Sequence, residues 1–466
     1  MKHHWILIKV LIFAFTVLGI SGQEGLQNLA QSQAPYFHHW ANVYSLDNGH
    51  VSVYNYHQVT RIRTASGGNY VIGGSKYQDT AGDSREQMTV FKLTKSGLVS
   101  WGISPLGCGH DGRARVSSLA VMSDGRIAVL GEYMETYDSV DSSIVLMMLS
   151  RTGSGQRIRT FLLGEGYDFS AYDLQATNDG GLILTGQLDH PWIAKLNSSG
   201  KIVWQHFLNG TVLSIRQTPD GGFIGAGVSG GYVGSPSSDA WLVKFNGQGK
   251  IMWQRSCGDP AAADVFRSVV RVGNGFVAVG ETQGLGASQN DVWVVKFDFQ
   301  GHIRWQRALA RSEPGHSTAV RSVVLLREGG YLVCANSDEG GLLVKLDALG
   351  NPLWARLLQA DLEDAVQTDQ GDCLLIGWQI LPSGCYPVGD VFNYLSIAAR
   401  VDTLGNIGQS CCLISSVNLT GRMTSAYSYN PHCAISHASI QVGSLSPTDF
   451  DYKPVQVFNV CQADIY

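Results

Sequence analysis

The sequence contains an internal repeat, and this repeat constrains the fold more than any other feature. The segment SSDAWLVKFNGQGKIMWQ, at Ser237–Gln254, returns 52 positions later as QNDVWVVKFDFQGHIRWQ, at Gln289–Gln306. Asp, Trp, Lys, Gly and a second Trp coincide in the two copies. Self-similarity at a fixed period is typical of folds built from copies of one structural unit. The same marks recur along the rest of the chain.

A glycine followed four residues later by a tryptophan marks most copies. The tryptophans of the five complete copies are Trp101, Trp204, Trp253, Trp305 and Trp354. Two degenerate copies keep only the glycine, at Gly155 and Gly405. The seven glycines are 45 to 58 residues apart, which predicts seven units with loop insertions of different length.

Each unit also has an upstream half, in which apolar segments flank a glycine-rich turn. Examples are Asn178–Gly181 and Gly273–Gly275. Glycine accepts the positive φ that tight hairpin turns require. Around Gly273–Gly275, the unit is predicted as four strands, SVVRV, FVAVG, VWVVKF and HIRWQ, joined in antiparallel order.

Four strands in about 50 residues, repeated seven times, predict an all-β chain and a seven-bladed β-propeller of four-stranded antiparallel blades. The fourth-strand tryptophans are then expected to pack between blades, and the lysines of the third strands (Lys195, Lys244, Lys296 and Lys345) to pack their stems and extend their heads to an edge. Two separate β domains are the alternative fold, but no linker-like break occurs between Ser66 and Gln409.

The ends of the chain leave the repeat. Residues 1–22 are predicted to be a signal peptide, because Lys2 and Lys9 accompany an apolar run that ends in small residues. Residues 23–35 form a polar leader, 36–410 the propeller and 411–466 a short Ser/Thr-rich C-terminal tail. Val43–Tyr56 has a hairpin signal at Asn48-Gly49, and we hypothesise that this segment completes the last blade.

Charge and cysteine content narrow the function. Without the two lysines of the predicted signal peptide, the formal net charge of −5 becomes −7, which argues against a nucleic-acid partner. After that segment no apolar stretch is long enough to span a membrane. Nine cysteines, an odd number, leave at least one thiol outside intramolecular disulfides. Cys334 and Cys373 lie in apolar runs and are expected to be buried thiols.

The unit D-x-W-L-V-K-F with the later G-x-I-x-W-Q resembles the repeat of exported bacterial and archaeal β-propeller proteins of unassigned function. The resemblance covers residues 58–410. LGNIGQSC, at Leu404–Cys411, also resembles the end of such propellers, where a Gly-Asn turn leads to a cysteine and the tail finishes on a second one. The resemblance thus implies a candidate disulfide between Cys411 and Cys461, with Cys412 as a competing partner.

A more distant resemblance is to quinoprotein-type propellers, whose tryptophan-docking motif places Asp, Gly and Trp around a turn as Asp347, Gly350 and Trp354 do here. Those rings usually have eight blades. The chain has no adjacent cysteine pair within the repeats, because Cys411 and Cys412 follow them. This resemblance implies the fold and not the cofactor, so we predict no cofactor.

No catalytic, cofactor-binding or metal residue is assigned from the sequence. Thr218–Phe223 approaches a sialidase Asp box but is better explained as an Asp-stabilised turn. The carboxylates Asp361, Glu363, Asp364 and Asp369 are interpreted as a solvated loop, with a calcium site as the alternative. Cys108 beside His110, and the pair His38-His39, are interpreted as ordinary loop and strand residues.

The sequence therefore predicts a secreted, non-catalytic propeller that acts as a binding or scaffold module for an unknown protein or glycan. The predicted recognition loops are Ser75–Glu86, Tyr133–Ser143, Ser229–Ser238 and Gly284–Asn290. The alternatives are a hydrolase or lyase acting on exported glycans, and a quinone-dependent oxidoreductase. Two carboxylates at the mouth of the central channel would favour the glycan enzyme.

Overall fold

The computed structural model describes most of the repeat region and short pieces of the two ends. The described ranges are 41–45, 54–80, 83–104, 112–134, 142–154, 157–162, 169–230, 238–259, 262–284, 290–311, 317–380, 394–407, 414–416, 419–423, 427–429, 441–443 and 456–459. The contacts divide the chain into Met1–His38 and His39–Tyr466, and everything below concerns the second unit. Within the described ranges, only strands and one 3-10 turn at Ser66–Gly68 are regular.

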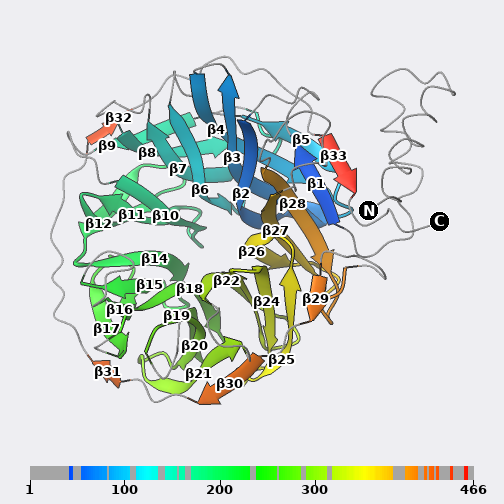
Figure 1. The fold of residues 1–466 in the computed structure, drawn as a ribbon. Helices are drawn as coiled ribbons and strands as arrows, with labels where there is room; N and C mark the ends of the chain where they lie inside the picture. Colours follow the sequence, from blue (N-terminus) through cyan, green and yellow to red (C-terminus); the bar gives the residue numbers. More distant parts are fainter. Residues whose placement is uncertain are drawn as a thin grey trace, which may run out of the picture. The chain divides into compact units, whose positions relative to one another are not determined.

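Hydrogen bonds join the described strands into six sheets, of which five are separate antiparallel blades (Figure 1). The repeat supplies β10 (Phe169–Ala176), β11 (Leu182–Leu188), β12 (His190–Leu196) and β13 (Ile202–Phe207) to one blade. The next contains β14 (Gly210–Gln217), β15 (Phe223–Ser229), β16 (Asp239–Phe245) and β17 (Ile251–Gly258). It is followed by β18 (Asp264–Val272), β19 (Gly275–Thr282), β20 (Asp291–Phe297) and β21 (Ile303–Arg311).

The remaining two separate blades come from the end of the repeat. One contains β22 (Thr318–Leu325), β23 (Tyr331–Ser337), β24 (Gly340–Leu346) and β25 (Pro352–Leu358). The other contains β26 (Asp361–Gln367), β27 (Cys373–Ile380), β28 (Tyr394–Val401) and, from the N-terminal segment, β1 (Ala41–Ser45). Because β1 pairs antiparallel with β28, the hypothesis that the N-terminal segment completes the last blade is confirmed for residues 43–45, whereas residues 54–56 of the predicted hairpin belong to β2 in another sheet.

The sixth sheet has nine strands and holds the first two repeats. Its first run is β2 (Tyr54–Ala65), β3 (Asn69–Thr80), β4 (Asp83–Leu93) and β5 (Val99–Ile103). Its second run is β6 (Arg113–Val121), β7 (Ile127–Met134), β8 (Ser142–Leu149) and β9 (Arg157–Leu162). The two runs are joined by a single parallel pair, Glu86 of β4 with Arg113 of β6.

The prediction of seven separate blades is therefore wrong in number, although the four-stranded antiparallel blade is observed. The reason is the length of the hairpin formed by β3, of 12 residues, and β4, of 11 residues. The extended β4 reaches β6, so that two repeats share one sheet. For the same reason most of Ser75–Glu86, predicted as a recognition loop, is strand.

Turn chemistry explains where the last two strands of each unit meet. Asn246 Oδ1 accepts hydrogen bonds from the backbone N–H groups of Gln248 and Lys250, which fixes the turn between β16 and β17. Gly249 follows with φ 79°, a conformation that glycine adopts at little cost. In the second repeat the corresponding glycine is Gly153, with φ 79°, so the assignment of Gly155 as the repeat glycine was wrong by two residues.

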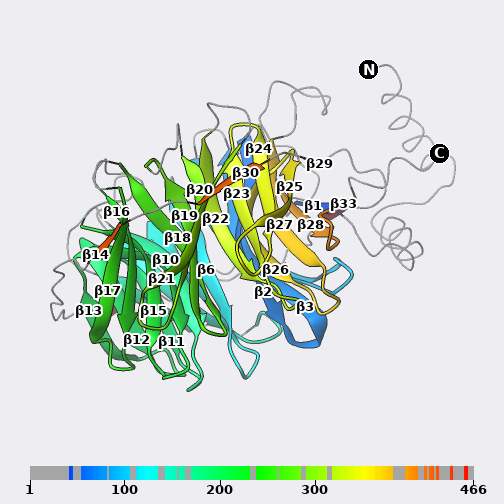
Figure 2. The same cartoon turned by 90° about the horizontal axis from the view of Figure 1, so that it is seen from below.

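The first strands of the repeats form the inner circle of the ring. Contacts run in order through β2, β6, β10, β14, β18, β22 and β26, and β26 contacts β2 again. These two strands lie side by side in both views (Figures 1 and 2). Apolar side chains of adjacent sheets form the core between them. At the closure, Ile62 and Ile72 pack with Leu374 and Ile376, all at most 1% exposed. Burial of this kind supplies most of the favourable free energy of such a fold.

The C-terminal tail adds short strands to the outer edges of most sheets. They are β29 (Ile414–Ser416), β30 (Leu419–Met423), β31 (Tyr427–Tyr429), β32 (Gln441–Gly443) and β33 (Gln456–Asn459). In this order they pair with β25, β21, β17, β9 and β1, and so follow the circumference of the ring (Figure 1). An outer strand has an unpaired edge, and the added strands pair part of it.

Candidate functional site

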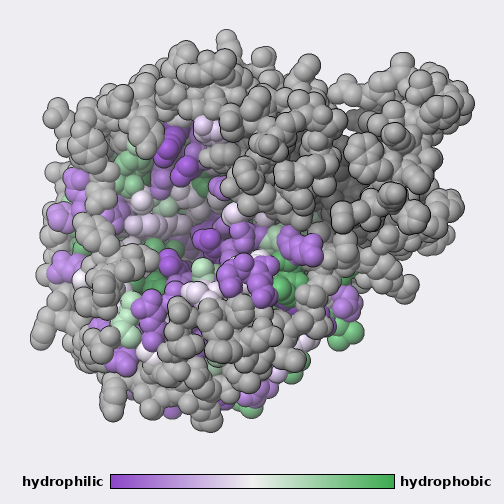
Figure 3. Space-filling model, viewed as in Figure 1, coloured by the Kyte–Doolittle hydropathy of each residue, from purple (hydrophilic) through white to green (hydrophobic). Residues whose placement is uncertain are grey.

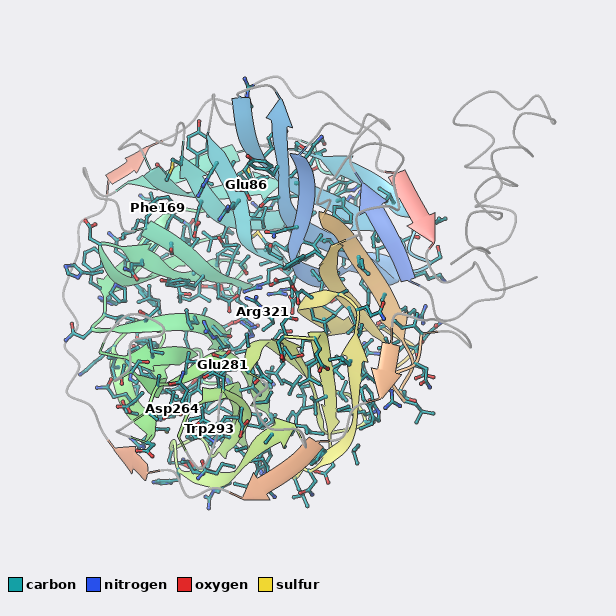
Figure 4. All side chains as sticks on the ribbon, viewed as in Figure 1. Glu86, Phe169, Asp264, Glu281, Trp293 and Arg321 are labelled. Atoms are coloured by element: carbon teal, nitrogen blue, oxygen red, sulfur yellow. The ribbon has the colours of Figure 1, made fainter. Side chains whose placement is uncertain are left out.

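The first strand of every repeat carries a β-bulge at the same place. The register between the first and second strands shifts by one residue in each case. The bulged residues, called the bulge ring below, are Thr60, Ser117, Tyr172, Leu213, Arg267, Arg321 and Glu363. Bulges re-aim side chains and are frequent beside functional sites. Arg321 lies near the centre of the ring in Figure 4, and hydrophilic residues gather around its hollowed centre in Figure 3.

Arg321 and Glu363 are neighbours in the bulge ring. Arg321 Nη2 lies 3.8 Å from Glu363 Oε1, and Trp378 Nε1 donates a hydrogen bond of 3.3 Å to the same oxygen. Burial raises the pKa of Glu363, because desolvation disfavours the carboxylate, and nearby Arg321 and Arg61 oppose this effect. Burial also raises the pKa of Asp361, two residues earlier on β26.

Arg267 is held by a carboxylate that also bonds to the neighbouring sheet. Arg267 Nη2 lies 3.1 Å from Glu281 Oε2, and Glu281 Oε1 accepts a 2.7 Å bond from the backbone N–H of Val320. Glu132 makes the equivalent bond to the backbone N–H of Ala171, at 2.9 Å. Glu281 and Glu132 thus fix the backbone just before the bulge of the next repeat.

Two buried aspartates hold arginines by the same geometry at two places in the ring. Asp173 Oδ2 accepts bonds from Arg216 Nη1 at 2.5 Å and from the backbone N–H of Ile215 at 2.9 Å. Asp364 Oδ2 similarly accepts from Arg63 Nη1 at 2.7 Å. Burial alone would raise the pKa of Asp173. The positive charges of Arg216, Arg63 and Arg61 lower this pKa by more, so the carboxyl group stays ionised.

A pocket of about 340 Å³ opens where four first strands end, on the side of the first hairpin turns. Arg216 and Gln217 line it from β14, Thr218 from the turn after β14, Gln175 from β10 and Arg271 from β18. The amide oxygens are already bonded: Gln175 Oε1 accepts from the backbone N–H of Gln217 at 2.7 Å. Gln217 Oε1 in turn accepts a 2.8 Å bond from the backbone N–H of Asn178, in the first turn of the preceding repeat. The pocket is polar and lies at one end of the inner circle.

The repeat tryptophans lie between neighbouring repeats. Trp101, Trp204, Trp253, Trp305 and Trp354 each face the positive-φ glycine in the last turn of the following repeat (Gly153, Gly249, Gly301, Gly350 and Gly405). Three of the indoles also donate Nε1–H to a carbonyl of that turn, as Trp204 does to Gly247 at 2.9 Å. All five are partly exposed. These contacts give the indoles a structural use.

The sequence marked a second set of tryptophans as repeat landmarks without assigning them a role. Trp192, Trp241 and Trp293, on the third strands, are at most 1% exposed. Each donates Nε1–H to the glutamine that follows the outer tryptophan, as Trp241 does to Gln254 at 3.2 Å. The alternation in WLVKF, together with the WQ pair, was the available signal.

The prediction that the third-strand lysines extend their heads to an edge is wrong for Lys244, whose head is bonded within the fold. Lys244 Nζ lies 2.8 Å from Asp220 Oδ2 and donates to the carbonyl of Phe245 at 2.9 Å. Asp220 also bonds to Gly222 N–H and to the Thr218 hydroxyl, which confirms the interpretation of this segment as an Asp-stabilised turn. Burial opposes ionisation of Asp220, but these bonds and the Lys244 charge together outweigh it and lower the pKa of Asp220 to about 2.

The acidic segment of residues 361–369 is mainly strand β26, so its interpretation as a solvated loop was wrong. Asp364 is buried at 6% exposure and paired with Arg63, whereas Asp369 is exposed and lies 3.1 Å from Arg327. Among the described residues, no group of three or more His, Cys, Asp or Glu side chains is arranged to hold a metal ion.

The cysteines that the structure describes in the repeat, Cys257, Cys334 and Cys373, are buried. Cys334 and Cys373 are 0% and 6% exposed, and burial raises the pKa of Cys373 to about 12. The expectation that they are buried thiols is confirmed. The candidate disulfide cysteines Cys411 and Cys461 lie outside the described residues, as do Cys108, His38-His39 and most of the other predicted recognition loops.

Comparisons with known proteins give distant similarities of structure only. No protein-family model and no curated protein sequence matches the chain. A protein of unknown function from Bacteroides caccae is 12% identical, with a TM-score of 0.36 over 64% of this chain and 92% of that one. A virginiamycin B lyase from Staphylococcus aureus is 11% identical, with a TM-score of 0.42 over 74% of this chain and 96% of that one. BamB from Moraxella catarrhalis is 11% identical, with a TM-score of 0.38 over 69% of this chain and 95% of that one. Similarities this low carry no argument about function.

The described residues contain no helix with the length and apolarity needed to cross a bilayer.

Proposed function

We propose that this chain is an exported β-propeller that acts as a binding or scaffold module for a protein or glycan. The observation that carries the proposal is the use of the inner carboxylates. Asp173, Asp364 and Glu281 each bond to an arginine and to backbone of the neighbouring repeat. Carboxylates committed in this way stabilise the ring and are not available as a general base.

The arginines of the bulge ring supply the binding surface in this proposal. The side chain of Arg321 is 42% exposed and that of Arg267 33% exposed, whereas their carboxylate partners are 15% and 7% exposed. Guanidinium groups offer several donors in a fixed plane and are frequent at binding hot spots. Export is proposed from the signal-like pattern of residues 1–22.

A glycan hydrolase is the second candidate, favoured by one observation. Glu363 and Asp361 both have a pKa raised by burial, and a general acid in glycoside hydrolysis requires a raised pKa. Glu363 is the residue that would give the proton, because it lies in the bulge ring.

The test applies the mature chain to glycan and peptide arrays. We expect selective binding that Arg321→Gln weakens about tenfold, because a charged hydrogen bond contributes about 1.5–3 kcal/mol. Arg151→Gln, at an exposed position outside the bulge ring, is the control and should bind as the parent does. An array without any selective ligand would contradict the proposal. Cleavage of an array glycan by the parent and not by Glu363→Gln would replace it with the second candidate.

A further inference from the structure

The polar part of the pocket beside Arg216 and Arg271 is rich in hydrogen-bond donors. Gln175 and Gln217 use their amide oxygens to accept backbone N–H groups, so their NH₂ groups remain for the pocket. Arg216 uses Nη1 for Asp173 and for the carbonyl of Ile215, which leaves its Nε–H and second amino group. No carboxylate is among the residues that line the pocket.

The charge around the pocket is positive. Arg271 is exposed and contributes a full positive charge to the lining. Behind the lining, Asp173 pairs with Arg216, and Asp220, which bonds to the Thr218 hydroxyl, pairs with Lys244. These carboxylates already have cationic partners, so Arg271 gives the lining an excess positive charge. A polar pocket with excess donors and excess positive charge favours an anionic occupant.

The dimensions limit the occupant further. A volume of about 340 Å³ is at the small end of the range of ligand pockets, roughly 300–1,000 Å³. Val270, Leu325 and Pro219 add an apolar wall to the lining. Such a wall suits a compact carrier with an apolar face, for example a sugar ring, that bears one acidic group.

We infer that this pocket, at the turn side of the inner circle, binds a small anionic ligand whose carboxylate, sulfate or phosphate group lies between Arg216 and Arg271. The inference rests on the proposed binding function and names a ligand class for it. Failure of this inference can be distinguished from failure of the proposed function. The arrays detect a ligand bound anywhere on the chain, whereas titrations of the pocket variants detect binding at this pocket.

The experiment titrates the purified mature chain with galacturonic acid, inorganic sulfate and inorganic phosphate, with galactose as the neutral control, by ligand-observed NMR. We expect saturable binding of at least one anion and none of galactose. Comparison of the three anions separates a sugar acid from a free inorganic ion. Raised salt should weaken the binding, because the attraction is electrostatic.

Two variants locate the binding. Arg271→Gln removes a charge at an exposed position and should lower affinity by about tenfold or more. Gln217→Glu keeps an oxygen that accepts from Asn178 N–H but replaces the NH₂ donor with a negative charge, so it should abolish binding. Arg151→Gln should bind as the parent does, and melting curves of all three check the fold. No saturable binding of any anion, or affinity unchanged in both pocket variants, would overturn the inference.

Discussion

The indole of Trp253 lies directly over Gly301, in the last turn of the following repeat. A Cβ atom added at Gly301 would lie 2.7 Å from Trp253 Cζ3, well inside van der Waals contact, and Gly301 has φ 80°. Trp253 Nε1 also donates to the carbonyl of Phe299 in the same turn, at 3.2 Å. The same residue pair recurs around the ring, so a tryptophan in one sheet and a glycine in the next determine how closely the sheets approach.

This relationship predicts a large effect of Gly301→Ala on stability. The new methyl group meets the indole and also occupies a positive-φ position, so we expect a loss of about 2–4 kcal/mol. Gly221→Ala is the matched control, because Gly221 has φ 76° but nothing within 4 Å of an added Cβ. It should cost only the strain of about 1–2 kcal/mol. Urea unfolding measures both, and equal losses would show that the Trp–Gly contact is unimportant.

Replacement of Lys296 is expected to raise the stability of the fold. Lys296 is 5% exposed, its Nζ has no hydrogen-bond partner, and burial lowers its pKa to about 8. The folded state therefore disfavours the protonated amine, and this lysine lowers stability at pH values below about 8. Its penalty disappears as the pH rises towards the ordinary value of 10.5. Lys296→Met should raise stability at pH 7 by up to about 3 kcal/mol.

The control for Lys296 is Lys244, at the same position one repeat earlier. Because Lys244 bonds to Asp220 and to the Phe245 carbonyl, Lys244→Met should destabilise the fold by about 1 kcal/mol. Thermal melts at pH 7 and pH 10 compare the two. A Lys296→Met protein that is less stable than the parent at pH 7 would contradict the reasoning.

Asp264 predicts a pH dependence of stability. Burial, aided by nearby Asp239 and Asp259, raises its pKa to about 6 from an ordinary 3.8. A raised folded pKa means that the folded state binds the proton more strongly. The contribution of Asp264 is therefore fully present below about pH 4 and is lost as the pH rises through 6. A shift of about 2 units corresponds to about 3 kcal/mol.

Asp264→Asn, which resembles the protonated acid, should remove this fall and be more stable than the parent above pH 6. The measurement is the free energy of unfolding from pH 4 to pH 8. The exposed Asp189, changed to Asn, is the control and should leave the profile unchanged. Parallel profiles for the parent and Asp264→Asn would show that the Asp264 carboxyl is not protonated in the way described.

Ring closure by β1 predicts different results for two truncations. Deletion of residues 23–45 removes β1 and exposes the edge of β28, so we expect loss of a single cooperative unfolding transition. Deletion of residues 23–35 removes only the polar leader and should leave the transition unchanged. Calorimetry distinguishes the two truncations. If the protein without residues 23–45 melts like the parent, β1 is not needed to close the ring.

The repeat made much of this fold predictable, because local features decide it. The turn glycines, such as Gly249, and the alternation of Trp241 with Lys244 placed the strands without any long-range information. The N-terminal closing strand followed from the missing strand in the last copy. The number of separate sheets did not follow, because one parallel pair between Glu86 and Arg113 depends on how far a hairpin extends in space.

The candidate site was not predictable in the same way. Arg216 and Asp173 are 43 residues apart and meet only because successive repeats stack around the ring. The bulge at Arg321 is a shift of register between β22 and β23. Such a shift leaves no mark in the order of apolar and polar residues, so the sequence could not predict it. Only the recurrence of polar residues in otherwise apolar first strands, as at Ser322 and Asp364, gave a signal.

The proposed function requires that the chain binds a ligand at the inner circle and leaves it chemically unchanged. The most direct measurement incubates the protein with a glycan or peptide selected on the arrays and follows both binding and ligand mass. We predict saturable binding that Arg321→Gln weakens about tenfold, with the ligand recovered intact. Release of a product by the parent, and its absence with Glu363→Gln, would contradict the claim.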